Sequence, residues 1–215
     1  MIARSSKYGK AVLGGAFIAL GTVPIWGSDY VLLFGLLFCL YLAMSQMWNL
    51  LTGYSGLLSL GQQSFIGFGG YTMAVLTNYY GVNVWLSVLI GGLFCVLLAL
   101  FMSLFIFRMS GIFFGIGTWI FAEILLLWFS NWDYVKYGSG LFIKPPHPPS
   151  MTTMYYAAFI MGAGGLAVVY TILRSRIGLG LMAMRDDEEV SETMGVEIFR
   201  SKLFCFLVAA FITGL

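Results

Sequence analysis

Charged residues are scarce in this sequence. Asp, Glu, Lys and Arg make up 9% of its 215 residues, whereas hydrophobic residues make up 60%. Soluble domains usually contain about a quarter charged residues, so water cannot be the main solvent of this surface. The net charge of +2 is also too small to indicate nucleic-acid binding. The composition therefore predicts a protein of the lipid bilayer that has no nucleic-acid partner.

Catalytic and metal-binding signatures are also missing. The sequence has one histidine, His147, and its three cysteines, Cys39, Cys95 and Cys205, lie in apolar runs without CxxC spacing. It contains no GxxxxGK[ST] phosphate loop, no HExxH motif and no GxSxG elbow. We therefore predict that this chain has no catalytic site, no metal and no cofactor, and that the cysteines are small buried hydrophobes.

Long apolar stretches recur along the chain, each about long enough to cross roughly 30 Å of hydrocarbon as a helix. The predicted spans cover residues 11–27, 31–50, 57–78, 84–106, 112–130 and 154–173, and a further apolar run opens at Leu203 and stops at Leu215. We predict an all-α, polytopic transmembrane helical bundle, with residues 1–215 as a single transmembrane domain.

The distribution of basic residues predicts the orientation of these spans. If the N-terminus lies inside, only Lys136 and Lys144 of the 11 Lys and Arg residues are outside. The cytoplasmic segments then hold Arg4, Lys7, Lys10, Arg108, Arg174, Arg176, Arg185, Arg200 and Lys202. An excess of Lys and Arg marks cytoplasmic loops, so we predict a cytoplasmic N-terminus.

Between the fifth and sixth predicted spans, the loop of residues 131–153 contains the proline-rich run 144–149. Proline fixes φ, so this run should be stiff and extended. It is either a spacer or a contact surface for an extracytoplasmic partner. His147 lies in it without a second histidine, and we assign it no function.

The most charged part of the chain is residues 174–202, on the predicted cytoplasmic side. Asp186 and Asp187 fit the acidic first turn of a helix, where the macrodipole favours negative charge, and Gly195 is a natural terminator. We therefore predict a surface helix of about two turns that ends near Gly195.

Two features are candidates for solute handling. Glycines interrupt the third predicted span, and polar residues there can offer hydrogen bonds: the candidates are Asn49, Gly53, Tyr54, Gly56, Ser59 and Gln62. The alternative is that the small residues serve close helix packing. The second feature is Glu123, the one ionisable residue well inside a span, which either lines a passage or is a structural carboxyl.

Three blocks of the sequence resemble the branched-chain amino acid ABC importer permeases, M-type subunit. The first is Asn49 to Gly61, which continues through Phe65, Gly67, Gly69, Gly70 and Tyr71; the second is Ser175 to Gly178, Ala183 to Glu188 and Glu192 to Val196; the third is Ser110 to Phe114, running on to Glu123, with 131–133 and 138–141. Gln62 departs from the family, where histidine is frequent at this position. Family members also continue past the point where this chain stops, so it resembles a truncated permease, incomplete at the C-terminus.

The resemblance implies a partner set and a role for the charged segment 174–202. A cytoplasmic coupling helix would sit in a groove of an ATPase and would use Arg185, Asp186, Asp187, Glu188, Glu192 and Gly195. The partners implied are a sister permease, two cytoplasmic ABC ATPase subunits that bind ATP, and an extracytoplasmic solute-binding protein, in a bacterial inner membrane. The solutes implied are branched-chain amino acids. Urea or short amides, or a gradient-driven secondary carrier, are the alternatives.

Overall fold

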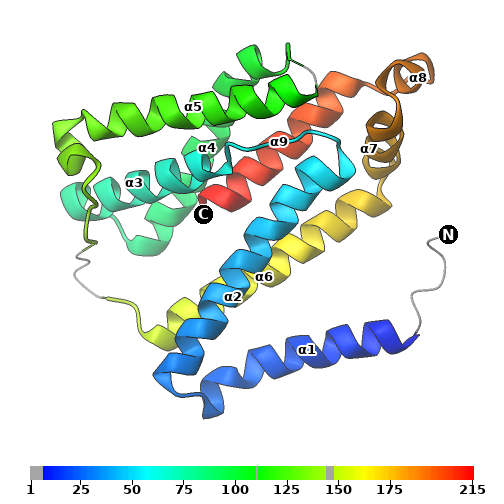
Figure 1. Cartoon of the computed structure of the whole chain (residues 1–215). Coiled ribbons are helices and arrows are strands. Elements are labelled where there is room, and N and C mark those ends of the chain that lie inside the picture. Colours follow the sequence, from blue (N-terminus) through cyan, green and yellow to red (C-terminus); the bar gives the residue numbers. More distant parts are fainter. Residues whose placement is uncertain (1–6, 110, 144–147) are drawn as a thin grey trace. The chain divides into compact units, whose positions relative to one another are not determined.

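Helices form most of the computed structural model, which describes residues 7–109, 111–143 and 148–215 (Figure 1). None of these residues forms a β-strand, and the predicted all-α class is confirmed. The α-helices are α1 (Lys7–Trp26), α2 (Asp29–Trp48), α3 (Gln62–Tyr80), α4 (Val84–Ile106), α5 (Ile112–Ser130), α6 (Met151–Arg174), α7 (Arg176–Asp186), α8 (Glu188–Thr193) and α9 (Ile198–Gly214); η1 (Asn49–Tyr54) is a π-helical turn and η2 (Asp133–Gly138) is a 3₁₀ segment.

Among the described residues, four stretches are long and apolar enough to cross a membrane: Asp29–Tyr54, Val84–Ile106, Ile112–Ser130 and Met151–Arg174. They match the predicted spans 31–50, 84–106, 112–130 and 154–173. The apolar helix Gly14–Trp26 lies within the predicted first span. The helix of the last apolar run begins at Ile198 rather than Leu203. Hydropathy did not detect its first five residues, because they include Arg200 and Lys202. The chain is therefore a polytopic membrane protein.

The predicted start of the third span at residue 57 is wrong. Residues 55–61 are not helical, and α3 begins only at Gln62. Gly56 has φ +70°, a left-handed conformation that an α-helix cannot contain. By contrast, Gly67, Gly69 and Gly70 lie inside an unbroken α3. The glycine interruption therefore precedes this helix and does not divide it.

The described residues group into two compact units. The first comprises Met1–Ala43 and Pro149–Gly164. Val23, Leu32 and Tyr155 form its small core, and the Tyr155 hydroxyl donates a hydrogen bond of 2.7 Å to the Leu20 carbonyl. Buried hydroxyls usually require such a partner, so this bond joins Tyr155 of α6 to α1.

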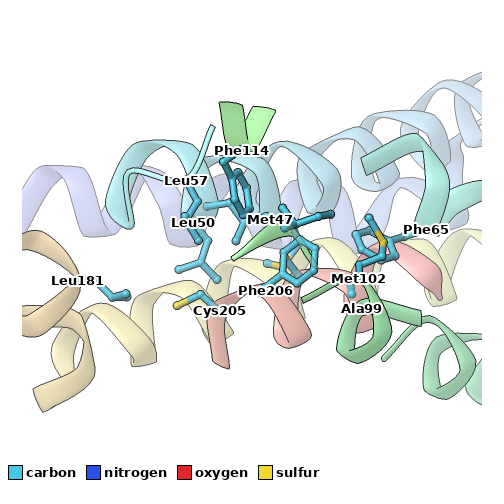
Figure 2. Close-up of a cluster of buried hydrophobic side chains, with 14 of the residues drawn as sticks. Met47, Leu50, Leu57, Phe65, Ala99, Met102, Phe114, Leu181, Cys205 and Phe206 are labelled. Carbon is cyan, nitrogen blue, oxygen red and sulfur yellow. The ribbon is translucent and has the colours of Figure 1, made fainter. Parts of the chain in front are cut away.

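The second unit comprises Met44–Pro148 and Gly165–Leu215, and it holds the larger core. The core side chains come from α2, η1 and the segment after it, α3, α4, α5, α6, α7 and α9. Figure 2 shows some of them; the labelled ones are Met47, Leu50, Leu57, Phe65, Ala99, Met102, Phe114, Leu181, Cys205 and Phe206. Cys39, Cys95 and Cys205 are buried, as predicted, and are free thiols.

The second unit has two distinguishable ends. At one end, the Phe107 ring lies 5.9 Å from that of Phe114 and 5.7 Å from that of Phe199, which joins the end of α4 to the starts of α5 and α9. At the other end, Tyr79 of α3 stacks on Tyr134 of η2 with ring centroids 4.6 Å apart. The loop residues 144–147, which include His147 and most of the proline run, lie outside the described residues, so the two interpretations of that run remain open.

Candidate functional site

The charged segment forms two short helices, α7 and α8, that meet at Asp187. This residue is extended (φ −156°, ψ 115°), and its carboxylate accepts a hydrogen bond of 3.1 Å from the Val190 amide. It is therefore the N-cap of α8, where an aspartate satisfies an otherwise unpaired amide. Gly195 has φ +84° and ends the turn after α8. The six-residue α8 confirms the predicted helix of about two turns.

The sequence pattern predicted both Asp186 and Asp187 in the first turn of this helix, and this prediction is wrong, because α8 begins at Glu188 and Asp187 is its N-cap. Asp186 is the last residue of α7, and its carboxylate pairs with Arg185 at 3.1 Å. The extended backbone at Asp187 separates the two adjacent acids, so only the second of them caps α8. The sequence pattern did not reveal that the backbone is extended at Asp187, between the two helices.

Other charges of the segment are engaged within the chain. Lys202 Nζ of α9 lies 2.6 Å from Glu188 Oε1, and its side chain is only 13% exposed. Glu188, Asp187 and Arg185 thus have intrachain partners. The exposed side chains of α8 and the following turn include Val190, at 49%, Met194, at 78%, Glu192 and Thr193. The outward surface of α8 is consequently mixed apolar and acidic.

The glycine-rich segment begins where α2 passes into the π-turn η1. The Ser55 amide bonds to the Leu50 carbonyl at 3.2 Å, and the Leu57 amide reaches the Leu51 carbonyl at 2.9 Å. Gly53 packs directly against the Asn49 side chain. The backbone therefore leaves helical geometry here in a defined turn and not as a loose loop.

Residues 57–61 then lie along the first turns of α5. The Leu60 amide donates a hydrogen bond of 3.1 Å to Thr118 Oγ1. A Cβ at Gly115 would lie 2.9 Å from the Leu58 carbonyl oxygen, and a Cβ at Gly61 would lie 2.8 Å from the Thr118 carbonyl carbon. Trp48 Nε1 donates a hydrogen bond of 3.1 Å to the Ser59 carbonyl oxygen. Non-helical backbone at membrane depth must be buried in protein or line a cavity, and Leu57, Ser59 and Gly61 of this segment are buried in protein.

Thr118 is fully buried and serves as the hydrogen-bond acceptor for this segment. We expect Thr118→Val to destabilise the chain by about 1 to 3 kcal/mol, because the near-isosteric side chain leaves the part-buried Leu60 amide without its acceptor. Thr118→Ser, which retains the hydroxyl, should keep most of the stability. Thermal unfolding of the purified chain in detergent measures both variants. Equal stability of the two would show that the bond to Leu60 is unimportant.

Glu123 lies on an exposed face of α5 beside a cavity of about 170 Å³. Trp119 Nε1 donates a hydrogen bond of 3.2 Å to its carboxylate. The lining residues come from α3 and α5: Gln63, Ser64, Gly67, Phe68, Ala122, Glu123, Leu125, Leu126 and Phe129. The cavity thus combines a carboxylate and an amide with an apolar wall.

The structure brings together only some of the residues predicted for solute handling. Glu123 shares its cavity with Gln63, whereas the neighbouring Gln62 is partly buried and its Nε2 atom has no partner among the described residues. Ser59 is buried among the helices, and Asn49, Gly53, Tyr54 and Gly56 lie in or beside η1. The sequence analysis did not identify Gln63 as a candidate site residue. Its position one turn before Gly67 places both residues on the face of α3 that lines the cavity.

Comparisons with known proteins give consistent matches. The model of the family described as "Branched-chain amino acid transport system / permease component" matches residues 30–215. The high-affinity branched-chain amino acid transport system permease protein LivM of Escherichia coli (strain K12) is 26% identical, over 81% of this chain and 48% of its own length. LivM of Salmonella typhimurium (strain LT2) is 25% identical over the same shares.

The chain therefore spans about half the length of the curated relatives that it matches. No solved structure matches it significantly. The family match covers every described helix from α2 to α9 and includes both the glycine-rich segment and the α7–α8 segment. This chain belongs to the family of permease components of branched-chain amino acid transport systems.

Proposed function

We propose that this chain is a transmembrane permease subunit of an ATP-driven importer for branched-chain, aliphatic amino acids. The observation that carries the proposal is the family match over residues 30–215, supported by relatives named as high-affinity branched-chain amino acid permeases. In this proposal the chain has no catalytic site and holds no cofactor. ATP is bound by two cytoplasmic ATPase subunits, and a binding protein delivers the solute from outside.

The N-terminus and the α7–α8 end of the second unit face the cytoplasm of a bacterial inner membrane in this proposal. Arg108, Arg174, Arg176, Arg185, Arg200 and Lys202 lie in the segments at this end, and Lys136 lies in η2 at the opposite end. This asymmetry supports the orientation, because Lys and Arg favour cytoplasmic segments. Residues 174–202 then act as the coupling segment, and residues 1–215 act as one permease domain.

The face of α3 and α5 that carries Glu123 forms part of the passage, together with the sister permease. A charged acid near the middle of a span costs about 2.5 to 3.5 kcal/mol on insertion scales, so Glu123 is poorly placed for contact with lipid. Its exposed position beside the α3–α5 cavity suits a water-filled passage at a subunit interface. The carboxylate can accept hydrogen bonds from the ammonium group of an amino acid, and the apolar wall can contact an aliphatic side chain.

The proposal is tested by reconstituting the chain into liposomes with its sister permease, both ATPase subunits and the binding protein. Uptake of leucine that requires ATP is the expected result. Uptake of urea or short amides in place of leucine would change the substrate class. Uptake driven by a proton or sodium gradient without ATP would replace the proposal by a secondary carrier.

The contact with an ATPase is expected to depend on the exposed side chains of α8. We expect Met194→Asp to reduce co-purification of the ATPase subunits by about tenfold or more, because burying a methionine side chain contributes about 1.5 to 3 kcal/mol. Met194 is 78% exposed and follows α8 directly. The measurement is pull-down of the ATPase subunits from membranes at matched expression of this chain.

Two control variants separate docking from folding. Phe142→Asp changes a side chain that is 88% exposed in the loop between η2 and α6, and it should leave ATPase capture unchanged. Asp187→Asn preserves the cap, since Asn and Asp cap helices about equally well, and should also preserve capture. If Asp187→Asn loses ATPase capture while Met194→Asp retains it, the contact with the ATPase depends on the charge of Asp187 instead.

A further inference from the structure

Arg185 joins the two segments on which the proposed function depends. Its Nη1 atom donates a hydrogen bond of 3.1 Å to the carbonyl oxygen of Gly53, which lies 132 positions earlier in the chain. Its Nε and Nη2 atoms bond to Asp186 at 3.3 and 3.1 Å. The guanidinium group therefore spans from the end of α7 to the glycine-rich segment.

The Gly53 carbonyl is a favourable acceptor for a cation. It lies near the end of η1, where the last carbonyl groups of a helix lack helical partners and the macrodipole is negative. The planar guanidinium can serve this carbonyl and the Asp186 carboxylate at the same time, because its donors point in different directions. Arg185 thus caps η1 from a different part of the chain.

The aliphatic part of Arg185 lies over Gly56. A Cβ at Gly56 would lie 3.4 Å from Arg185 Cγ and 3.5 Å from Arg185 Cα, so the two backbones run close together. Met184, which directly precedes Arg185, and Leu181, one turn earlier in α7, are buried in the same core cluster as Leu50 and Leu51 of η1 (Figure 2 shows Leu181 and Leu50). The end of α7 is therefore attached to η1 by both apolar and polar contacts.

The glycine-rich segment continues this contact into α5. Beyond Gly56, Leu58 packs on Gly115, and the Leu60 amide bonds to Thr118. Glu123 lies five residues further along α5, beside the α3–α5 cavity. An unbroken series of contacts thus runs from α7, through residues 53–61, to the helix that carries Glu123.

We propose that Arg185 is a positioning residue that holds the glycine-rich segment to α7, so that a displacement of α7–α8 moves residues 53–61 and α5 with it. The inference rests on the proposed function. It gives Arg185 a role within the chain, in place of the contact with an ATPase that the resemblance implies. Coupling energy between distant sites requires such an element, whose position both sites influence.

The test uses the reconstituted importer with Arg185→Gln, Arg185→Lys and the control Arg108→Gln. Arg108 follows α4, is exposed, and lies outside the coupling segment 174–202. We expect Arg185→Gln to retain the ATPase subunits and ATP turnover, while uptake per ATP falls by about tenfold, as the loss of a hydrogen bond from a charged donor suggests. Arg185→Lys should be intermediate, and Arg108→Gln should match the native chain.

A second readout is independent of transport. Spin labels at Leu60 and Leu179, which are 44% and 70% exposed, report the distance between the glycine-rich segment and α7. In the native complex the distance distribution should stay narrow, with a constant mean, through the ATP cycle. It should broaden in Arg185→Gln, or in Arg185→Lys if Arg185→Gln does not assemble.

Three results would overturn the inference. Unchanged uptake per ATP in an assembled Arg185→Gln complex would show that the contact transmits nothing. Loss of ATPase capture in Arg185→Gln and Arg185→Lys would show that Arg185 acts at the docking surface. A native complex without ATP-dependent uptake would overturn the proposed function itself, and the inference with it.

Discussion

Gly69→Ala is expected to destabilise the second unit by at least about 1 to 3 kcal/mol, the usual cost of overpacking a well-packed interior. A Cβ at Gly69 of α3 would collide with the carbonyl group of Gly214 in α9, with the carbonyl carbon 2.9 Å away and Gly214 Cα 3.0 Å away. Both neighbours are backbone, so no side-chain rotation can relieve the collision.

The same position also contacts α4. A Cβ at Gly91 would lie 3.1 Å from the Gly69 carbonyl oxygen, and one at Gly214 would overlap the Cys95 side chain. Small residues allow helices in a membrane to approach this closely. The glycines at this crossing of α3, α4 and α9 therefore serve close packing, which is the alternative considered for the small residues of the sequence.

The stability of Gly69→Ala is measured by thermal unfolding of the purified chain in detergent, with Gly70→Ala as its matched control. Gly70 is the next residue of α3, and a Cβ there has no neighbour within 4 Å. Alanine favours a helix over glycine by roughly 0.5 to 1 kcal/mol, so Gly70→Ala should be neutral or stabilising. Equal stability of the two variants would contradict the close approach of α3 and α9.

Glu123→Gln is expected to reduce ATP-dependent uptake by about tenfold or more without loss of the assembled complex. The substitution keeps the shape of the side chain and removes its charge. Hydrogen bonds to a charged group contribute about 1.5 to 3 kcal/mol and neutral ones about 0.5 to 1.5, a difference that corresponds to about a factor of ten. The measurement is leucine uptake at a matched amount of reconstituted complex, with chain stability measured in parallel.

Trp119→Phe separates the two interpretations of Glu123. It removes the indole that donates the 3.2 Å hydrogen bond to the carboxylate and leaves the carboxylate at the cavity. If Glu123 lines the passage, Trp119→Phe should retain most of the uptake. If Glu123 is instead a structural carboxyl, both Trp119→Phe and Glu123→Gln should destabilise the chain, and uptake should fall only as far as assembly falls.

The sequence predicted correctly those helices whose limits are set by residues close to them in the chain. The spans 84–106 and 112–130 match α4 and α5 residue for residue, because each is an unbroken apolar run between polar or glycine-containing turns. The two-turn helix near Gly195 was predictable for a similar reason, since a capping acid and a left-handed glycine define its limits. Each of these signals lies within a few residues of the structure that it determines.

The errors occurred where neighbouring residues offered equivalent choices. Asp186 and Asp187 were both predicted in the first turn of one helix, and of the two glutamines that begin α3 only Gln62 was predicted as a solute-handling residue. In each pair the structure decides between them through the backbone: the extended conformation at Asp187 assigns the cap, and the register of α3 turns Gln63 toward the cavity beside Glu123. The start of α3 was misplaced because an apolar sequence such as residues 57–60 is compatible with a helix until its contacts with α5 are known.

The sequence by itself determined the solvent, the helical class, most of the spans and the family, because composition, hydropathy and ordered motifs are properties of the chain alone. Only the tertiary structure decided that Arg185 bonds to Gly53, that the glycine-rich segment packs against Gly115 and Thr118, and that Gly69 contacts Gly214. These pairs are far apart in the sequence, and each is selected by shape and hydrogen-bond satisfaction between surfaces that exist only after the helices have packed.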